Sequence, residues 1–293
     1  MDQTPRARPS REWWQLLTAL PGERGRVLVV GPCDSGKTAL CQWLVERLAE
    51  SGPTAWVDAD VGQSQIGPPA CVGWRMADSH TERYCFVGDV TPATVPAATV
   101  AATVRMVTEA EASGARLVVT DTTGYLQGQA ALAIKGAELD LLAPLHLVAL
   151  GDSPEVRRLL AAWHRDSRVT VHRLPVADAI RQKTPAERSA WRQAQFAKYL
   201  QGSELHCLSL RGMALSGLPT AGELRAAGLD WNALQGLLIG FHGPQRQTLS
   251  LGLVHHLDMH GQQLTARATE APTAATGIIF GAIRLQPDGS PRT

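Results

Sequence analysis

The chain of 293 residues has little net charge and very little lysine. Its 28 basic residues are nearly balanced by 27 acidic ones, for a formal net charge of +1, so composition alone indicates no nucleic-acid partner. Because the chain uses arginine for most of its positive charge, a lysine at a special position is more informative than usual. Lysine occurs only at Lys37, Lys135, Lys183 and Lys198.

Cysteine pairs and long apolar runs are also missing. Cys33, Cys41, Cys71, Cys85 and Cys207 show no paired spacing, so the sequence favours neither a zinc site nor a disulfide framework. Reduced thiols are typical of the cytoplasm, which is where we expect the protein to be. No apolar run has the length of a signal peptide or of a bilayer span, so we expect no membrane association.

Short apolar runs alternate with amphipathic segments over the first two thirds of the chain. This alternation predicts an α/β fold, in which helices cover both faces of a parallel sheet. Such sheets bind ligands at the carboxyl ends of their strands. Strands are expected at residues 26–30, 55–58, 84–87, 115–120, 146–150 and 169–174, and helices at 12–20, 38–50 and 97–112.

The pattern changes after residue 203. Shorter strand candidates follow, separated by turns rich in Gly, Pro, His and Gln, and they predict a small β-rich C-terminal domain. These candidates are residues 236–241, 247–254, 264–268 and 277–285. We therefore divide the chain into an N-terminal extension (1–24), an α/β domain (25–203) and a β-rich domain (204–293).

The first expected strand leads into a phosphate-binding loop. Residues 31–38 satisfy the pattern G-x-x-x-x-G-K-[ST], with a strand before and a helix after, and they predict the parallel sheet of a P-loop NTPase. Glycines let backbone N–H groups face the phosphates, and the helix N-terminus adds its positive dipole end. Lys37 is expected to reach the β- and γ-phosphates, and Thr38 to offer a hydroxyl to magnesium. The residues expected at the nucleotide are Gly31, Pro32, Cys33, Asp34, Ser35, Gly36, Lys37, Thr38 and Ala39.

Two aspartates, Asp58 and Asp60, follow in the segment Asp-Ala-Asp-Val-Gly-Gln that ends at Gln63. Carboxylates two positions apart in an extended segment lie on the same side of the chain. At the carboxyl end of a strand they face the γ-phosphate, where one of them accepts a proton from an attacking hydroxyl or holds magnesium. The alternative is a turn or capping pair, which an isolated Asp-x-Asp more often forms. Proximity to the phosphate-binding loop favours the functional interpretation.

A third acidic position, Asp121, opens the segment Asp-Thr-Thr-Gly-Tyr after another buried strand. An acid at this place in a phosphate-loop protein commonly holds magnesium through water. The segment also has the Asp-x-x-Gly pattern of GTPases, but a guanine-specific GTPase normally needs an Asn-Lys-x-Asp type of motif as well. The only asparagine is Asn232, in the C-terminal region, so we do not expect a GTPase switch.

A basic segment precedes the β-rich domain. Between Asp152 and Leu200 the chain carries ten Lys or Arg and five Asp or Glu, which suits a phosphate-rich substrate. Arg188 and Arg192 are four positions apart, so on a helix they share a face. We expect a lid near residues 180–202 whose arginines neutralise charge on the transferred phosphate. The alternative interpretation is an ordinary solvated helix.

Taken in order, these segments resemble the Clp/Grc family of polynucleotide 5′-hydroxyl kinases, and the compact layout is most similar to its prokaryotic members. The matching pieces are GPCDSGKT, DADVGQ, FVGDVTP, VVTDTTGYLQG and FAKYLQG, followed by GLLIGF, LSLGLV and GIIFGAIRLQPDG. The resemblance covers roughly residues 25–290. It implies transfer of the ATP γ-phosphate, with Mg²⁺ as cofactor, to the 5′-hydroxyl end of single-stranded RNA or DNA.

The resemblance also implies roles for individual residues. Lys37, Arg188 and Arg192 match catalytic positions, and Asp60 matches the family's catalytic acid. Thr38 matches the family's magnesium residue, and Asp60 and Asp121 are also expected on the metal side because of their place beside the phosphate-binding loop. The residues expected on the substrate side are Asp58 and Gln63, together with a clasp formed by Thr122, Thr123, Gly124 and Tyr125.

Two departures and two alternatives limit these implications. The eukaryotic members carry an N-terminal β-domain where this sequence has about 24 residues before its first strand, so partner docking by that domain is not carried over. Tyr125 stands where many members have tryptophan, which leaves the substrate preference open. An ATP-bound scaffold with little turnover, or a kinase for a small-molecule hydroxyl, would use the same phosphate-binding loop.

Overall fold

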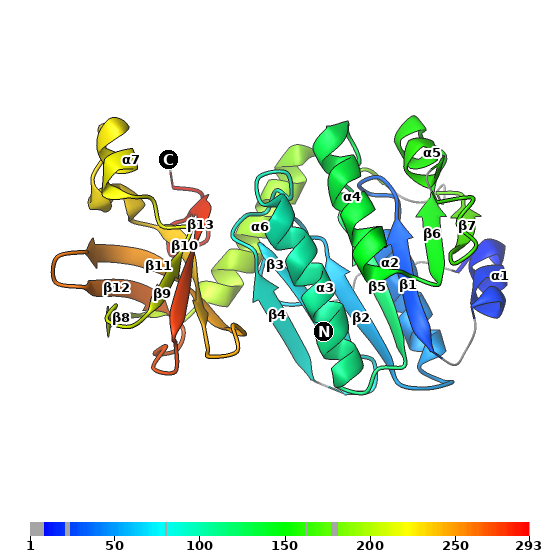
Figure 1. The fold of residues 1–293 in the computed structure, drawn as a ribbon, viewed down its shortest axis with the longest axis horizontal. Coiled ribbons are helices and arrows are strands. Elements are labelled where there is room, and N and C mark those ends of the chain that lie inside the picture. Colours follow the sequence, from blue (N-terminus) through cyan, green and yellow to red (C-terminus); the bar gives the residue numbers. More distant parts are fainter. Residues whose placement is uncertain (1–8, 21–23, 80, 162, 177–180, 293) are drawn as a thin grey trace.

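The computed structural model describes residues 9–20, 24–79, 81–161, 163–176 and 181–292. Two β-sheets lie side by side, with a helix between them (Figure 1). Residue 180, at the start of the expected lid, and residues 1–8 and 21–23 of the expected extension lie outside this description. No helix among the described residues has both the length and the apolar character that a bilayer crossing requires.

The first sheet has seven strands in the order β4-β3-β2-β5-β1-β6-β7. Pairing is parallel from β2 to β7, which confirms the expected α/β fold, but β3 runs antiparallel to both of its neighbours. No strand was expected at β3, and the mostly parallel sheet changes direction at this edge. The strands are β1 (Gly25–Val30), β2 (Thr54–Ala59), β3 (Cys71–Met76), β4 (Glu82–Phe86), β5 (Leu117–Thr122), β6 (His146–Leu150) and β7 (Thr170–Leu174).

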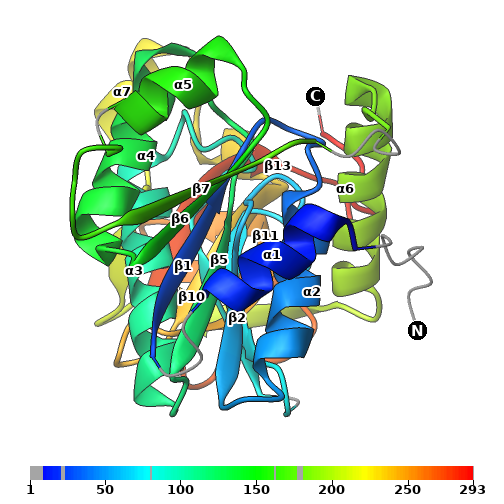
Figure 2. The ribbon, with the colours of Figure 1, turned by 90° about the vertical axis from the view of Figure 1, so that its right-hand side faces the viewer.

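Helices cover both faces of this sheet, and the alternation of side chains along β1 shows why its sequence is apolar throughout. Val27 and Val29 pack with α1 and α2 on one face, whereas Leu28 and Val30 pack with α3, α4 and α5 on the other. Figure 2 shows these two helical layers on either side of the strands. The helices are α1 (Arg11–Ala19), α2 (Lys37–Leu48), α3 (Pro96–Ala112), α4 (Gly128–Leu142) and α5 (Pro154–Ala161).

The second sheet begins at Glu204 and has the strand order β8-β12-β11-β10-β13-β9. All of its pairs are antiparallel except β13 with β9. Four of its strands were expected from the sequence, but β8 and β9 were not. The elements are β8 (Glu204–Ser209), β9 (Ala214–Ser216), α7 (Ala221–Ala226), η1 (Trp231–Leu234), β10 (Leu237–His242), β11 (Thr248–Asp258), β12 (Gln263–Ala268) and β13 (Gly277–Arg284).

The remaining helix, α6 (Pro185–Leu200), joins the two sheets. Its C-terminal end is buried, because Phe196 and Leu200 pack in a cluster with Phe86 of β4 and Leu251 of β11. Beside this cluster the backbone N–H of Phe86 donates to Thr248 Oγ1 over 3.0 Å. The helix therefore starts near the carboxyl edge of the first sheet and ends inside the contact between the two sheets (Figure 1).

Candidate functional site

The phosphate-binding loop lies between β1 and α2, as expected. Gly36 and Asp34 both adopt positive φ angles, 90° and 52°, which turn the backbone into the tight curl of the loop. Lys37 is 5% exposed, and its Nζ donates to the carbonyl of Pro32 over 2.7 Å. The buried Ser35 hydroxyl has no hydrogen-bond partner within the described part of the chain. An anion in the loop would give both of these donors a partner.

The strand register brings the acidic positions to this loop. Asp121 is paired with Val29 of β1 on one side and with Asp58 of β2 on the other. Thr38 Oγ1 donates to Asp121 Oδ2 over 2.6 Å, while Asp121 Oδ1 is buried without a partner among the described residues. Burial raises the pKa of Asp121 to about 6. A hydroxyl and a buried carboxylate with an unused oxygen fit Mg²⁺, which prefers oxygen ligands.

Asp58 and Asp60 have different surroundings. Asp58 is 1% exposed, and its carboxylate accepts the backbone N–H groups of Asp60, over 3.0 Å, and of Gln65. Burial, and then the charge of Asp121, raise the pKa of Asp58 well above its usual value. Asp60 is half-buried, and its Oδ1 accepts the backbone N–H of Gly62 over 3.1 Å. Asp58 thus shapes the turn that presents Asp60.

The residues of the expected clasp also differ in burial. Thr122 is fully buried at the end of β5, and its hydroxyl donates to the Val29 carbonyl over 2.9 Å. Its hydroxyl is already bonded because β5 continues two residues beyond the expected strand, and a substrate-side role for Thr122 stays a prediction. A Cβ at Gly124 would lie 2.6 Å from the backbone nitrogen of Cys33, so this glycine lets the clasp backbone lie against the phosphate-binding loop.

Thr123 and Tyr125 belong to the expected clasp and follow the end of β5. Thr123 is 4% exposed, and its hydroxyl accepts the backbone N–H of Tyr125 over 3.3 Å. Tyr125 is half-buried and follows Gly124, whose backbone lies against the phosphate-binding loop. An accessible aromatic ring beside a phosphate site is a surface on which a base stacks.

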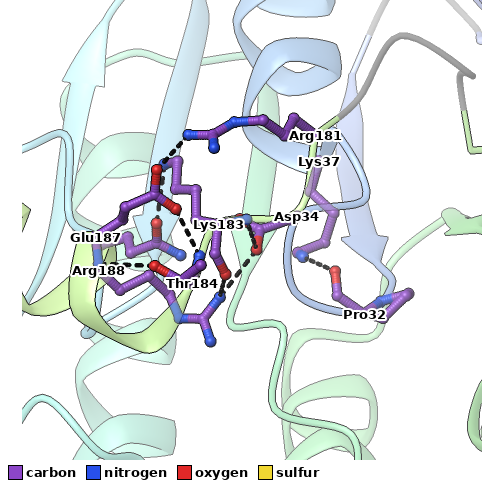
Figure 3. Close-up of polar contacts among 9 residues, drawn as sticks. Pro32, Asp34, Lys37, Arg181, Lys183, Thr184, Glu187 and Arg188 are labelled. Atoms are coloured by element: carbon purple, nitrogen blue, oxygen red, sulfur yellow. Dashed lines mark hydrogen bonds and ion pairs between the residues drawn. The ribbon is translucent and has the colours of Figure 1, made fainter.

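The lid begins with a capping box at the N-terminus of α6. Thr184 Oγ1 accepts the backbone N–H of Glu187, and the Glu187 carboxylate accepts that of Thr184. Pro185 at the first helical position fixes a backbone angle suited to the helix. This cap orients the first turn of α6 so that Arg188 reaches Asp34 of the phosphate-binding loop, with 3.0 Å between Nη1 and Oδ2 (Figure 3).

Two further lid residues lie near the turn that bears Asp60. Burial, and then the Arg188 charge, lower the pKa of Arg192, whereas the Asp60 charge raises it. Lys183, which the sequence analysis did not select, places its Nζ 3.0 Å from the Gln63 amide oxygen. The only signal for Lys183 was its rarity as a lysine in an arginine-rich chain.

The family model described as mRNA cleavage and polyadenylation factor CLP1 P-loop matches residues 31–202. The chain belongs to this family. The matched region holds the phosphate-binding loop, all three aspartates and both lid arginines, and the resemblance inferred from the motifs is confirmed.

Individual relatives agree with this assignment. The chain is 28% identical over 201 residues to a polyribonucleotide 5′-hydroxyl-kinase of Pyrococcus furiosus, which covers 66% of this chain and 55% of that protein. It is 26% identical, over the same shares of both chains, to a protein of the same name from Pyrococcus abyssi. The chain thus spans about half the length of the curated relatives it matches. A Clp1 kinase of Xenopus tropicalis is 49% identical over 55 residues, 18% of this chain and 12% of that protein.

The fold is shared with a solved structure. The Clp1p–Pcf11p complex superposes with a TM-score of 0.69 at 12% identity, covering 94% of this chain and 80% of that chain. At this identity the likeness concerns the fold, and it extends over both sheets.

Proposed function

We propose that the chain is an ATP-dependent kinase that phosphorylates the 5′-hydroxyl end of single-stranded RNA or DNA. The observation that carries this proposal is the meeting of three elements at one sheet edge: the phosphate-binding loop, the turn bearing Asp60, and the lid bearing Arg188. The names of the Pyrococcus relatives point to the same reaction. We also propose a cytoplasmic location. The cysteines among the described residues are free, and reduced thiols are typical of the cytoplasm.

Each side chain has a definite task in this reaction. The loop amides bind the triphosphate, and Lys37 exchanges its bond to the Pro32 carbonyl for one to a phosphate oxygen. Asp60 orients the 5′-hydroxyl and accepts its proton. Arg188 and Arg192 stabilise the negative charge on the oxygens of the transferred phosphate.

The cofactor would be held by Thr38 and Asp121, whose oxygens already lie together. When bound, Mg²⁺ supplies positive charge that neutralises the phosphate oxygens. On the acceptor side, the half-buried Tyr125 ring stacks on a terminal base, and the base-tolerant nature of stacking suits a substrate of varied sequence.

The test is phosphate transfer from γ-labelled ATP, with magnesium, to matched 5′-hydroxyl RNA and DNA oligonucleotides. We expect label on the oligonucleotide with the natural chain and none with Lys37→Ala, because the lysine contacts the transferred phosphate. Comparison of the two oligonucleotides gives the polymer preference. Bound, intact ATP without transfer would overturn the kinase and favour a scaffold, and transfer only to a small hydroxyl compound would overturn the polymer substrate.

A further inference from the structure

A carboxylate stands inside the phosphate-binding loop, and the lid is bonded to it. Asp34 Oδ2 accepts the backbone N–H of Lys183 and the Arg188 Nη1 group, each over 3.0 Å (Figure 3). The Asp34 side chain is only 7% exposed and that of Arg188 is 26% exposed. A negative charge beside a triphosphate site is unfavourable, so a carboxylate retained there calls for a partner that offsets its charge.

The lid makes a second contact on the other side of the site. Lys183 Nζ donates to Gln63 Oε1 in the turn that follows Asp60, and Arg188 also donates to the Lys183 carbonyl. The stretch from Lys183 to Arg188 therefore bridges the two loops that would flank the transferred phosphate. The bonds from the lid to Asp34 and to Gln63 connect residues more than a hundred positions apart. Only the bond from Arg188 to the Lys183 carbonyl lies within the lid.

The far end of α6 is fixed independently of these contacts. Tyr199 accepts the backbone N–H of Leu251 over 2.9 Å, and its hydroxyl lies 3.1 Å from that of Tyr84. A Cβ at Gly289 would lie 2.5 Å from the backbone nitrogen of Ala197, so the C-terminal segment packs directly on the helix. With one end held between the sheets, the position of the other end depends on what it bonds at the phosphate-binding loop.

An isolated surface ion pair would have little effect on structure, because solvent screens it. Asp34 differs in two ways. Its carboxylate is buried, and it accepts a backbone N–H as well as a guanidinium, which fixes the path of the lid backbone in addition to one side chain. Charge-assisted bonds of this kind are stronger and more directional than neutral ones.

We propose that Asp34 is a positioning residue that latches the lid onto the phosphate-binding loop and so places Arg188 at the transferred phosphate. The role in catalysis rests on the proposed kinase function, but the latch itself does not. Lys183 completes the latch through Gln63. The nucleotide contacts proposed for the loop come from its amides and from Lys37, whereas the Asp34 carboxylate is bonded to the lid.

Two substitutions remove or weaken the latch without straining the loop. Glycine and asparagine both tolerate the positive φ of 52° at this position, unlike alanine. Asp34→Gly removes the acceptor, whereas Asp34→Asn keeps an oxygen for the Lys183 N–H but loses the charge. Asp166→Ala is the matched control, because Asp166 pairs with Arg168 at 2.6 Å in an exposed connection outside the lid.

The first experiment is limited trypsin digestion of the natural chain and these variants without any polynucleotide. Trypsin cleaves after Arg181 and Lys183, at the exposed start of the lid, and the cleavage rate reports the population of the released lid. We expect cleavage there to be about tenfold faster in Asp34→Gly and increased to a smaller extent in Asp34→Asn. The control should match the natural chain. Equal rates in all four proteins would overturn the latch, whether or not the chain is a kinase.

The second experiment separates positioning from a general weakening of the site. Asp34→Asn should lower kcat about tenfold while the KM for ATP changes by less than about threefold, because the loop backbone still binds the nucleotide. Adding Asp34→Asn to Arg188→Ala should lower kcat no further, since the two residues act through one contact. A rise in KM alone, or losses that multiply in the double variant, would show that Asp34 does not act through Arg188.

Discussion

At the scale of single residues, Asp58 and Asp60 differ in what their carboxylates bind. Asp58 accepts two backbone N–H groups in the core, whereas Asp60 lies at the site beside the lid arginines. We predict that Asp60→Asn lowers phosphate transfer by about 10²–10⁴-fold without lowering the melting temperature. Asp58→Ala should lower the free energy of unfolding by about 1–3 kcal/mol, because it leaves buried donors unpaired.

Transfer rates and thermal unfolding of both variants test this division. Asp58→Asn is the matched control, since it keeps an oxygen in the same place and should recover much of the lost stability. A stable Asp58→Ala variant, or an Asp60→Asn variant with near-natural transfer, would contradict the assignment.

The sequence predicted these residues because both lie at the carboxyl end of a strand. The sequence did not predict which hydroxyl or carboxylate would be buried and hydrogen-bonded within the core. Thr122 was expected on the substrate side. The strand β5 extends two residues further than expected, and the Thr122 side chain is therefore buried. The ion pair between Asp34 and Arg188 could not be predicted either. The two residues are 154 positions apart, and a local sequence pattern contains no information on such a contact.

At the scale of secondary structure, β6 and β7 carry a histidine pair. His146 Nδ1 lies 3.0 Å from His172 Nε2 across the two parallel strands. Burial lowers the pKa of both rings from 6.5, and the neighbouring His172 lowers that of His146 further. Both rings are thus held neutral, with one donating to the other.

This pair predicts a loss of stability in mild acid. Well above pH 6.5 the rings are neutral in the folded and the unfolded chain, so they contribute no pH dependence. Below that pH the unfolded chain binds protons first, and the free energy of unfolding falls as the pH decreases. We expect His172→Gln to lose less stability than the natural chain between about pH 7.5 and pH 5.5, measured by denaturant unfolding. Parallel curves for the two proteins would contradict this.

Helices and strands with a clear apolar pattern, or with a recognisable motif beside them, were predicted from the sequence. The strand β3 shows why others were missed. Its sequence, CVGWRM, is buried along most of its length. No helix separates β3 from β2 or β4 in the chain, so the alternation of strands and helices that revealed the other strands is absent. Gly73 belongs there because a Cβ would lie 2.6 Å from the Ile66 carbonyl, so the residue that looks like a strand breaker is required by packing. A local pattern does not contain that constraint.

At the scale of the whole molecule, the sequence predicted an α/β part followed by a β-rich part, but not how they meet. The contact depends on glycines that allow close approach of two backbones. A Cβ at Gly281 of β13 would lie 2.5 Å from the carbonyl oxygen of Gly88, and one at Gly240 would lie 2.5 Å from the Phe86 ring. The boundary near residue 203 stays a prediction, although the second sheet starts at Glu204.

The same contact gives the last prediction. In Gly281→Val the new side chain meets backbone oxygens of Gly88 and Leu238, which cannot rotate away, so the two sheets must separate slightly. We expect the free energy of unfolding to fall by about 1–3 kcal/mol, as for other overpacked sites. Because α6 ends in this contact, the lid is also displaced, and the transfer rate should fall with stability. Gly136→Val is the control, since a Cβ at Gly136 meets nothing within 4 Å. If both valine variants unfold at the same temperature and transfer phosphate equally well, close packing of the sheets does not support the site.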